Sequence, residues 1–266
     1  MKKLILLLFI PIFFTCSDDE SSDGNDNNSN NPGAQKLIES ITVISGECEN
    51  THNLWLYYDD ENRISSYEFQ YVVTNCDGDE GSNSEIGEGQ FEYAENNLTW
   101  IHLGVSYSFP INDDGTINDA NLTFVDGYLI SEDPNAGGTY DAINCETTHI
   151  WVDNNLIETN QVENNLNECY AVDTVYEYSS NINPIPFFWP NNYVGWGTAF
   201  ILTGALGKES QNLISKETGF HSWGQGVYDF QYQLDDDGYP IVIYTEYNSS
   251  SNNFNRSVNY EITYIE

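Results

Sequence analysis

Alternating hydrophobic and polar residues are the dominant pattern of this chain, and they predict β-strands. Tyr67, Phe69, Tyr71 and Val73 alternate with polar neighbours, and the same period recurs over residues 258–264. A period of two places one set of side chains on a packed face and the other set in water. The chain is therefore expected to be rich in half-buried strands.

Short acidic turns separate the alternating segments. Each turn has an apolar or aromatic residue, then two or three of Asp, Asn or Glu, often a Gly, and then Leu, Ile or Tyr. Asp-Gly and Asn-Asn pairs tolerate the positive φ that tight hairpin turns need. The turns lie at residues 57–64, 93–98, 111–117, 151–157 and 234–239. Together these features predict an all-β fold, an antiparallel β-meander arranged as a curved sheet or as a sandwich.

One region departs from this pattern and predicts the only helix. Three prolines between residues 184 and 190 are incompatible with a regular helix or a central strand there. The following segment, Thr198–Leu206, contains the apolar run Phe200 to Leu202 and is followed by Gly207. Because glycine commonly ends helices, we expect a short helix between Thr198 and Leu206.

The N-terminus predicts an exported lipoprotein. Residues 1–15 combine two lysines with an apolar run about half as long as a membrane-spanning helix, which is typical of a signal peptide. The residues before Cys16 resemble a loose Bacteroidetes lipobox, so we expect lipid on Cys16 and anchoring to outer-membrane lipid. Residues 16–33 are acidic and polar, which predicts a disordered tether and resembles a cell-surface export signal. Residues 34–266 would then form the β-rich domain.

The net charge of the chain limits which classes of partner it can bind. Removal of the leader leaves five basic and 42 acidic residues, a net charge of −37. A surface this acidic repels phosphate groups, so nucleic acid binding is the least favoured function.

Four cysteines besides Cys16 predict disulfides. An even number of cysteines in an exported chain favours two disulfides over a thiol or zinc site, because none forms a CxxC pair. Three pairings are possible. We favour Cys48–Cys76 and Cys145–Cys169, because each pair brackets one predicted hairpin.

The C-terminal half resembles a known family. Its signature comprises Tyr176–Ser179, Asn181 and Asn183, then Gly207–Ile214, and a final part from Tyr232 through Asp237–Pro240. These segments resemble the Bacteroidetes lipoprotein family called domain of unknown function 4595, with its YD-like hairpin turns. The resemblance implies a β-rich exported lipoprotein and no reaction.

Catalytic and metal-binding patterns are weak in the sequence. It has no GxSxG, HExxH or phosphate-binding glycine loop, and its histidines, His52, His102, His149 and His221, are isolated. We therefore expect no catalytic residues and no cofactor. Calcium at acidic turns such as 113–115 and 235–238 is the weaker alternative to ordinary hairpin-turn chemistry.

An aromatic cluster is the best binding candidate. It comprises Phe188, Trp189, Tyr193, Trp196 and, farther along, Trp223. Such rings stack on sugars or anchor protein partners, but they equally fill cores. Three hypotheses follow. The first is a non-catalytic binding module for a glycan or envelope component, the second an interaction lipoprotein that docks on an outer-membrane protein, and the third a carboxylate-based hydrolase.

Overall fold

The computed structural model contains one continuous 15-stranded sheet in which every strand pair is antiparallel. It describes residues 36–45, 50–74, 80–136, 145–162, 172–185, 196–221, 224–250 and 255–265. The signal peptide, Cys16 and the tether lie outside these residues and stay predictions.

The strands and the single described helix follow in chain order. They are β1 (Ile38–Ser45), β2 (Asn50–Tyr58), β3 (Ile64–Thr74), β4 (Glu80–Ala94), β5 (Asn97–His102), β6 (Val105–Pro110), β7 (Leu122–Val125), β8 (Tyr128–Glu132), β9 (Thr147–Val152), β10 (Asn155–Gln161), β11 (Val172–Ile182), α1 (Trp196–Ile201), β12 (Asn212–His221), β13 (Gly224–Leu234), β14 (Pro240–Ser249) and β15 (Asn255–Tyr264).

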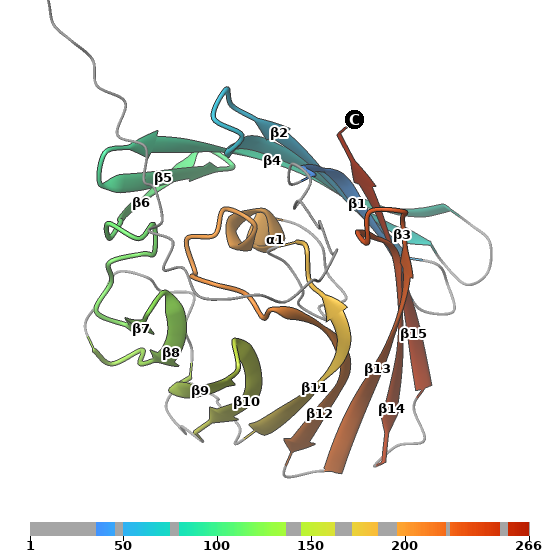
Figure 1. Ribbon diagram of the computed structural model, residues 1–266. Coiled ribbons are helices and arrows are strands. Elements are labelled where there is room, and N and C mark those ends of the chain that lie inside the picture. The colour runs from blue at the N-terminus through green and yellow to red at the C-terminus, as the bar shows by residue number, and fades with distance from the viewer. Residues whose placement is uncertain are drawn as a thin grey trace, which may run out of the picture. The chain divides into compact units, whose positions relative to one another are not determined.

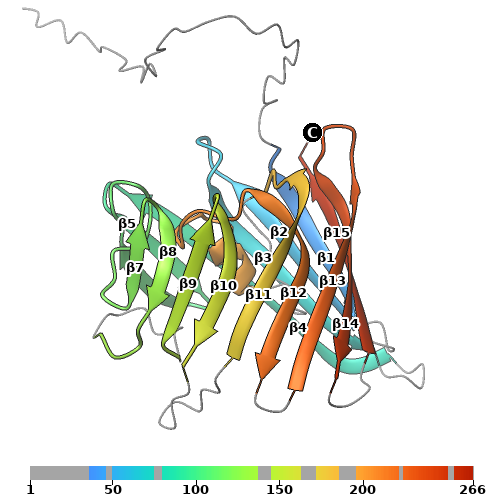
Figure 2. The ribbon, with the colours of Figure 1, turned by 60° about the horizontal axis from the view of Figure 1, so that its bottom comes forward.

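The sheet is a meander that is joined through its first and last strands. Sequential strands pair with each other except β6 and β7, and β1 also pairs with β15, so the sheet order runs from β6 through β1 and β15 to β7. The sheet curves around α1, with β4–β6 on one side of the helix and β8–β12 on the other (Figures 1 and 2). The prediction of an all-β antiparallel meander with one short helix is confirmed, and the sheet is the curved form rather than a sandwich.

The acidic turns fold by a shared hydrogen-bond pattern. In the β2–β3 turn, the Asp59 carboxylate accepts bonds from the amides of Glu61 and Arg63 at 3.0 and 2.9 Å. In the β13–β14 turn, the Asp235 carboxylate accepts the amides two and four residues later at 3.0 and 2.8 Å. Asn62 and Gly238 supply the positive φ values, 62° and 88°. The aspartate carboxylates therefore accept hydrogen bonds from turn amides that have no backbone carbonyl partner in the hairpin.

The concave face of the sheet forms the core with α1. Phe200 of α1 is buried, and its ring centroid lies 5.3 Å from that of Trp100 and 5.4 Å from that of Phe109. These contacts place the helix against β5 and β6. Gly87 of β4 leaves room for the Phe69 ring, because a Cβ at Gly87 would lie 2.3 Å from that ring. A large ring beside a glycine permits close packing where the sheet curves.

The helix is shorter than the sequence predicts. It covers Trp196–Ile201, and turns replace the rest of the expected Thr198–Leu206 segment. The Thr203 hydroxyl donates to the Phe200 carbonyl at 2.7 Å, and Gly204 adopts a φ of 77°. These two features follow the end of the helix at Ile201, which lies six residues before Gly207. Among the described helices, none is long and apolar enough to cross a membrane.

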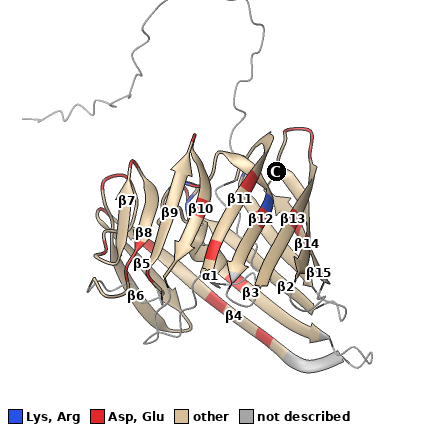
Figure 3. Cartoon of the chain, turned by 90° about the horizontal axis from the view of Figure 1, so that it is seen from below, with Lys and Arg blue, Asp and Glu red and all other residues tan. Residues whose placement is uncertain are grey.

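Acidic residues are spread over strands and turns, with few basic residues among them (Figure 3). On β4, for example, Glu88 and Glu92 are exposed while Gly87, Gly89 and Phe91 between and beside them are buried. The alternation that predicted the strand therefore also separates charge from core.

Candidate functional site

The predicted aromatic cluster falls mostly outside the described residues. Phe188, Trp189, Tyr193 and Trp223 lie outside them. Trp196 begins α1, but its side chain is also outside the described part. The glycan role of this cluster stays a prediction, and the described cavities lie elsewhere.

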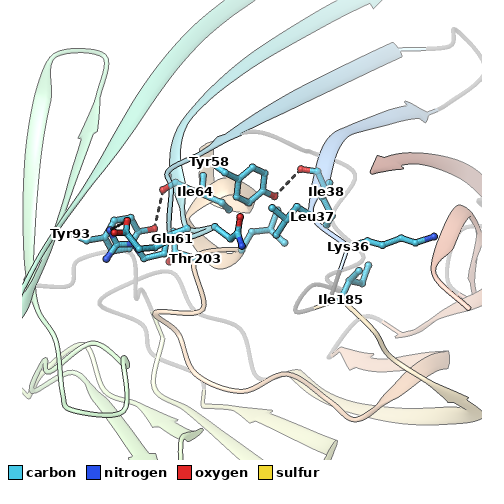
Figure 4. A pocket seen from close by; sticks show the side chains of 12 residues that line it. Lys36, Leu37, Ile38, Tyr58, Glu61, Ile64, Tyr93, Ile185 and Thr203 are labelled. Atoms are coloured by element: carbon cyan, nitrogen blue, oxygen red, sulfur yellow. Dashed lines mark hydrogen bonds and ion pairs between the residues drawn. The ribbon is translucent and has the colours of Figure 1, made fainter. Parts of the chain in front are cut away.

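A cavity of about 430 Å³ lies where the β2–β3 turn meets the end of β4 and the segment after α1 (Figure 4). We call it the Tyr58–Tyr93 cavity. Its walls are aliphatic and aromatic, and polar side chains come mainly from the β2–β3 turn. It is lined by Lys36, Leu37, Ile38, Tyr58, Glu61, Asn62, Arg63, Ile64, Tyr93, Ile185, Leu202 and Thr203.

Both tyrosine rings of this cavity are held in place by their hydroxyls. Tyr58 donates to the Ile38 carbonyl at 2.8 Å, and Tyr93 donates to the Ile64 carbonyl at 3.0 Å (Figure 4). Burial raises the pKa of each phenol to about 12, so both stay neutral donors at physiological pH. The rings therefore offer a fixed, uncharged surface.

Charges around this cavity are paired within the protein. Arg63 lies 2.7 Å from Asp59 and 3.0 Å from Glu61, and its guanidinium lies 4.5 Å from the centroid of the Tyr93 ring. Desolvation raises the pKa of Asp59, but the hydrogen bonds from the Arg63 side chain and from the amides of Arg63 and Glu61 outweigh this effect and hold the pKa below its usual value.

Lys36 is paired in the same way. Its ammonium lies 2.7 Å from Asp235 and 2.6 Å from Asp237, in the β13–β14 turn. The cavity therefore combines fixed tyrosine rings with polar groups whose charges are largely neutralised.

This turn was one of the alternative calcium sites. Asp235 and Asp237 are engaged by Lys36 instead, and Asp114 of the other acidic turn accepts the amide and the hydroxyl of Thr116. Within the described ranges, no group of three or more His, Cys, Asp or Glu side chains is placed to hold a metal ion. The contacts of these acidic turns are those of ordinary hairpin turns, and calcium binding there stays a prediction.

A second cavity, of about 240 Å³, lies between β8–β10 and the segment after α1. We call it the Glu209 cavity. Its lining is mainly apolar, with a few ionisable groups. The lining residues are Leu122, Leu129, Glu132, His149, Trp151, Leu156, Ile201, Leu206, Lys208 and Glu209.

The fold gives His149, which is isolated in the sequence, two partners. One ring nitrogen lies 2.9 Å from the Glu132 carboxylate and the other 3.1 Å from the Thr159 hydroxyl. Glu132 and Glu209 both line the cavity, so it contains two carboxyl groups, as the hydrolase hypothesis requires, although Glu132 is already engaged. Sequence reasoning missed the group of Glu132, His149 and Glu209 because its members are separated by 17 to 77 positions along the chain.

Two partly buried carboxyl groups have raised pKa values. Burial raises the pKa of Glu209 to about 8 and that of Glu217 to about 7. Tyr178 interacts electrostatically with both groups, which places them in one interior region. Nothing in the sequence around Glu209 or Glu217 predicts that these side chains are shielded from solvent.

The disulfide pairings stay predictions. Of the four cysteines, Cys145 lies within the described residues. Cys48, Cys76 and Cys169 lie outside the described residues, so neither predicted pair is described in full.

Comparisons with known proteins place the fold. No family model matches the sequence, so the resemblance to domain of unknown function 4595 stays a prediction, and no curated protein matches either. A solved porin-like protein from Bacteroides uniformis is similar in structure, with a TM-score of 0.63 and 17% identity, over 85% of this chain and 98% of that chain. A porin-like protein from Bacteroides vulgatus gives a TM-score of 0.41 and 13% identity, over 86% of this chain and 99% of that one. The first likeness shows a shared fold.

Proposed function

We propose that this protein is a lipid-anchored surface protein of the outer membrane that binds a neutral glycan, without catalysis, in the Tyr58–Tyr93 cavity. The observation that supports this most is the pairing of two immobilised tyrosine rings with hydrogen-bonding side chains of one turn. The proposal moves the binding site from the predicted tryptophan cluster to the described tyrosine cavity.

The chemistry of the cavity matches that of a sugar ring. Sugars present apolar C–H faces, which aromatic rings cover, and hydroxyl edges, which amides and carboxylates bond. Tyr58 and Tyr93 supply the rings, and Asn62, Glu61 and Thr203 supply donors and acceptors at the cavity wall. A volume of about 430 Å³ falls in the range of small-ligand sites.

The charge balance favours a neutral ligand. Arg63 and Lys36 are the basic residues of the cavity, and each is held by two carboxylates. Neither cation is left to attract an anionic sugar. The surrounding excess of acidic residues repels such a sugar further.

A binding measurement tests the glycan proposal. The mature chain carrying Cys16→Ser would be titrated calorimetrically with a panel of neutral oligosaccharides. We expect saturable binding that weakens at least tenfold in Glu61→Gln and in Asn62→Gly, about 1.4 kcal/mol for one or two lost hydrogen bonds. Glycine at position 62 keeps the positive φ, so the turn itself is preserved.

Asp60→Asn is the matched control, because Asp60 is exposed in the same turn and does not line the cavity. Binding that is equally strong in all three variants would place the glycan elsewhere. An absence of binding across the panel would reject the proposal.

The location is a separate part of the proposal. It is supported by the lipobox-like sequence before Cys16 and by the fold shared with a porin-like Bacteroides protein. Cys16→Ala in the native host should move the protein from the membrane to the soluble fraction. Protease treatment of intact cells then tests exposure at the surface, and retention of Cys16→Ala in the membrane would contradict the lipid anchor.

Docking on an outer-membrane protein is the second candidate function. Among the described strands, β6 and β7 each have a strand neighbour on one side only. Leu103, in the turn before β6, is 61% exposed, and Val105, the first residue of β6, is 52% exposed. An edge with exposed apolar side chains can accept a strand from a partner. Crosslinking from position 105 on intact cells should then capture an outer-membrane protein.

A further inference from the structure

The Glu209 cavity is built as an apolar chamber with one fixed aromatic wall. Leu129 and Leu156 are among its aliphatic lining, and the Trp151 indole N–H donates to the Leu129 carbonyl at 2.8 Å. The Tyr128 ring centroid lies 4.7 Å from that of Trp151, behind the wall. The ring that faces a ligand is thus held by both a hydrogen bond and a ring contact.

Glu209 lacks a partner in this chamber. Within the described part of the chain, no side chain or backbone group forms a hydrogen bond or ion pair with its carboxyl group. In the Tyr58–Tyr93 cavity and the neighbouring turn, by contrast, Asp59 is paired with Arg63 and Asp235 with Lys36. Glu209 is partly buried, and a carboxyl group shielded from water without a partner is less stable as a carboxylate unless a ligand supplies the partner.

The neighbouring cations are already engaged. The Lys208 ammonium donates to the Asp126 carbonyl at 2.7 Å and lies 5.0 Å from the centroid of the Tyr128 ring. His149 uses one ring nitrogen on Glu132 and the other on Thr159. Neither basic group therefore neutralises Glu209.

The other titratable neighbour is a tyrosine. The Tyr178 hydroxyl bonds the Leu156 carbonyl and the Ser210 hydroxyl, and burial raises its pKa to about 12. It is neutral over the working pH range and supplies no counter-charge to Glu209.

We propose that the Glu209 cavity binds a small organic cation, an apolar body with one primary amine, whose ammonium pairs with the Glu209 carboxylate while the body packs against Trp151. Binding converts the protonated carboxyl to a carboxylate, so one proton leaves Glu209 for solvent as one ammonium ion enters. The amine keeps its own proton.

Charge and ring chemistry favour a cation over the alternatives. The net charge of −37 concentrates cations near the protein and repels anions. Trp151 offers the π face that attracts an ammonium group most strongly among aromatic side chains. A neutral alcohol could accept a hydrogen bond from the protonated Glu209, but it would gain nothing from the charge. This proposal concerns a different cavity from the glycan site, so the outcome of the glycan experiment does not affect it.

Benzylamine is a suitable probe, with benzyl alcohol as its neutral match. The mature chain with Cys16→Ser would be titrated calorimetrically at pH 6.5 in two buffers with different ionisation enthalpies. We expect benzylamine to bind with release of about one proton, because a carboxyl with a pKa near 8 is almost fully protonated at that pH. Affinity should rise about tenfold per pH unit up to pH 7.5, because ionised Glu209 becomes more abundant.

Two variants locate the site. Glu209→Gln should reduce benzylamine affinity at least tenfold and remove the proton release. Glu217→Gln is the matched control, since this second buried carboxyl does not line the cavity and its loss should leave both quantities unchanged. Binding of benzyl alcohol as tight as that of benzylamine would overturn the proposal. Binding of benzylamine without proton release, or with unchanged affinity in Glu209→Gln, would also overturn it. An absence of benzylamine binding to the unsubstituted chain would do the same, and this test does not depend on whether a variant folds.

Discussion

The two buried glutamates make a specific prediction about how stability depends on pH. Glu209 has a pKa of about 8 and Glu217 a pKa of about 7, both raised by burial from 4.5. The folded protein therefore binds protons more tightly than the unfolded chain at these sites. Their contribution to stability is complete below pH 4.5 and is lost as the pH rises through 7 and 8.

The magnitude follows from the size of the two shifts. One pKa unit corresponds to 1.36 kcal/mol, so full conversion gives roughly 5 kcal/mol for Glu209 and roughly 3 kcal/mol for Glu217. Both side chains face some solvent, and screening reduces these values. We expect the pair to cost the protein about 4 kcal/mol between pH 5 and pH 9.

The assay compares the unsubstituted chain with the Glu209→Gln/Glu217→Gln double variant. Urea unfolding at pH 5, 7 and 9, with disulfides kept oxidised, gives the free energy of unfolding at each pH. Repulsion among the other acids changes with pH in both proteins, so the difference between the two isolates the glutamate pair. The double variant should gain about 4 kcal/mol relative to the unsubstituted chain from pH 5 to pH 9.

A single exposed substitution, Glu92→Gln, controls for the removal of one negative charge, because Glu92 lies on the outer face of β4. It should change the free energy of unfolding by less than about 0.5 kcal/mol at every pH. If the curves of the unsubstituted chain and the double variant stay parallel from pH 5 to pH 9, the carboxyl groups are not buried as described and the reasoning fails.

Further predictions concern packing and a buried hydrogen bond. Gly87→Ala should destabilise the fold by about 1–3 kcal/mol, because its Cβ would meet the Phe69 ring at 2.3 Å, and chemical denaturation measures this. Gly197→Ala in α1 is its control, since no atom lies within 4 Å of the added carbon; a loss of stability there would contradict the packing argument. Tyr67→Phe should cost about 1–3 kcal/mol in the same measurement, because the buried Trp100 indole N–H, 3.0 Å from the Tyr67 oxygen, loses this acceptor; an unchanged midpoint would refute it.

Local features of the fold could be predicted from the sequence because they depend on near neighbours. The alternation around Tyr67 and Phe69 specifies a strand and its buried face, and both side chains are buried. The acidic turn at 57–64 specifies a hairpin because Asp59 bonds amides two and four residues away. The helix was placed in the right segment, but its end depends on the Thr203 hydroxyl and on Gly204, which a hydrophobic pattern does not report.

Long-range features could not be predicted in this way. A period of two shows which face of β1 is buried but not that its second partner is β15, more than 200 residues later. The Tyr58–Tyr93 cavity unites the ends of β2 and β4 with Ile185 and Thr203, and no short motif records that arrangement. The sequence drew attention to tryptophans, because large rings are visible without a fold, whereas two tyrosines become a candidate site only when the sheet places them together.

The distribution of basic residues explains how the two cavities come to differ. The chain after the leader has five basic residues, and two of them, Lys36 and Arg63, line the Tyr58–Tyr93 cavity. Each neutralises two acids of a hairpin turn there, which leaves a cavity of paired charges suited to a neutral ligand. In the Glu209 cavity, Lys208 is bonded to a backbone carbonyl and leaves a carboxyl group unmatched. A carboxyl group without a partner in an apolar cavity can form an ion pair with a cationic ligand. The two cavities should therefore select ligands of different charge.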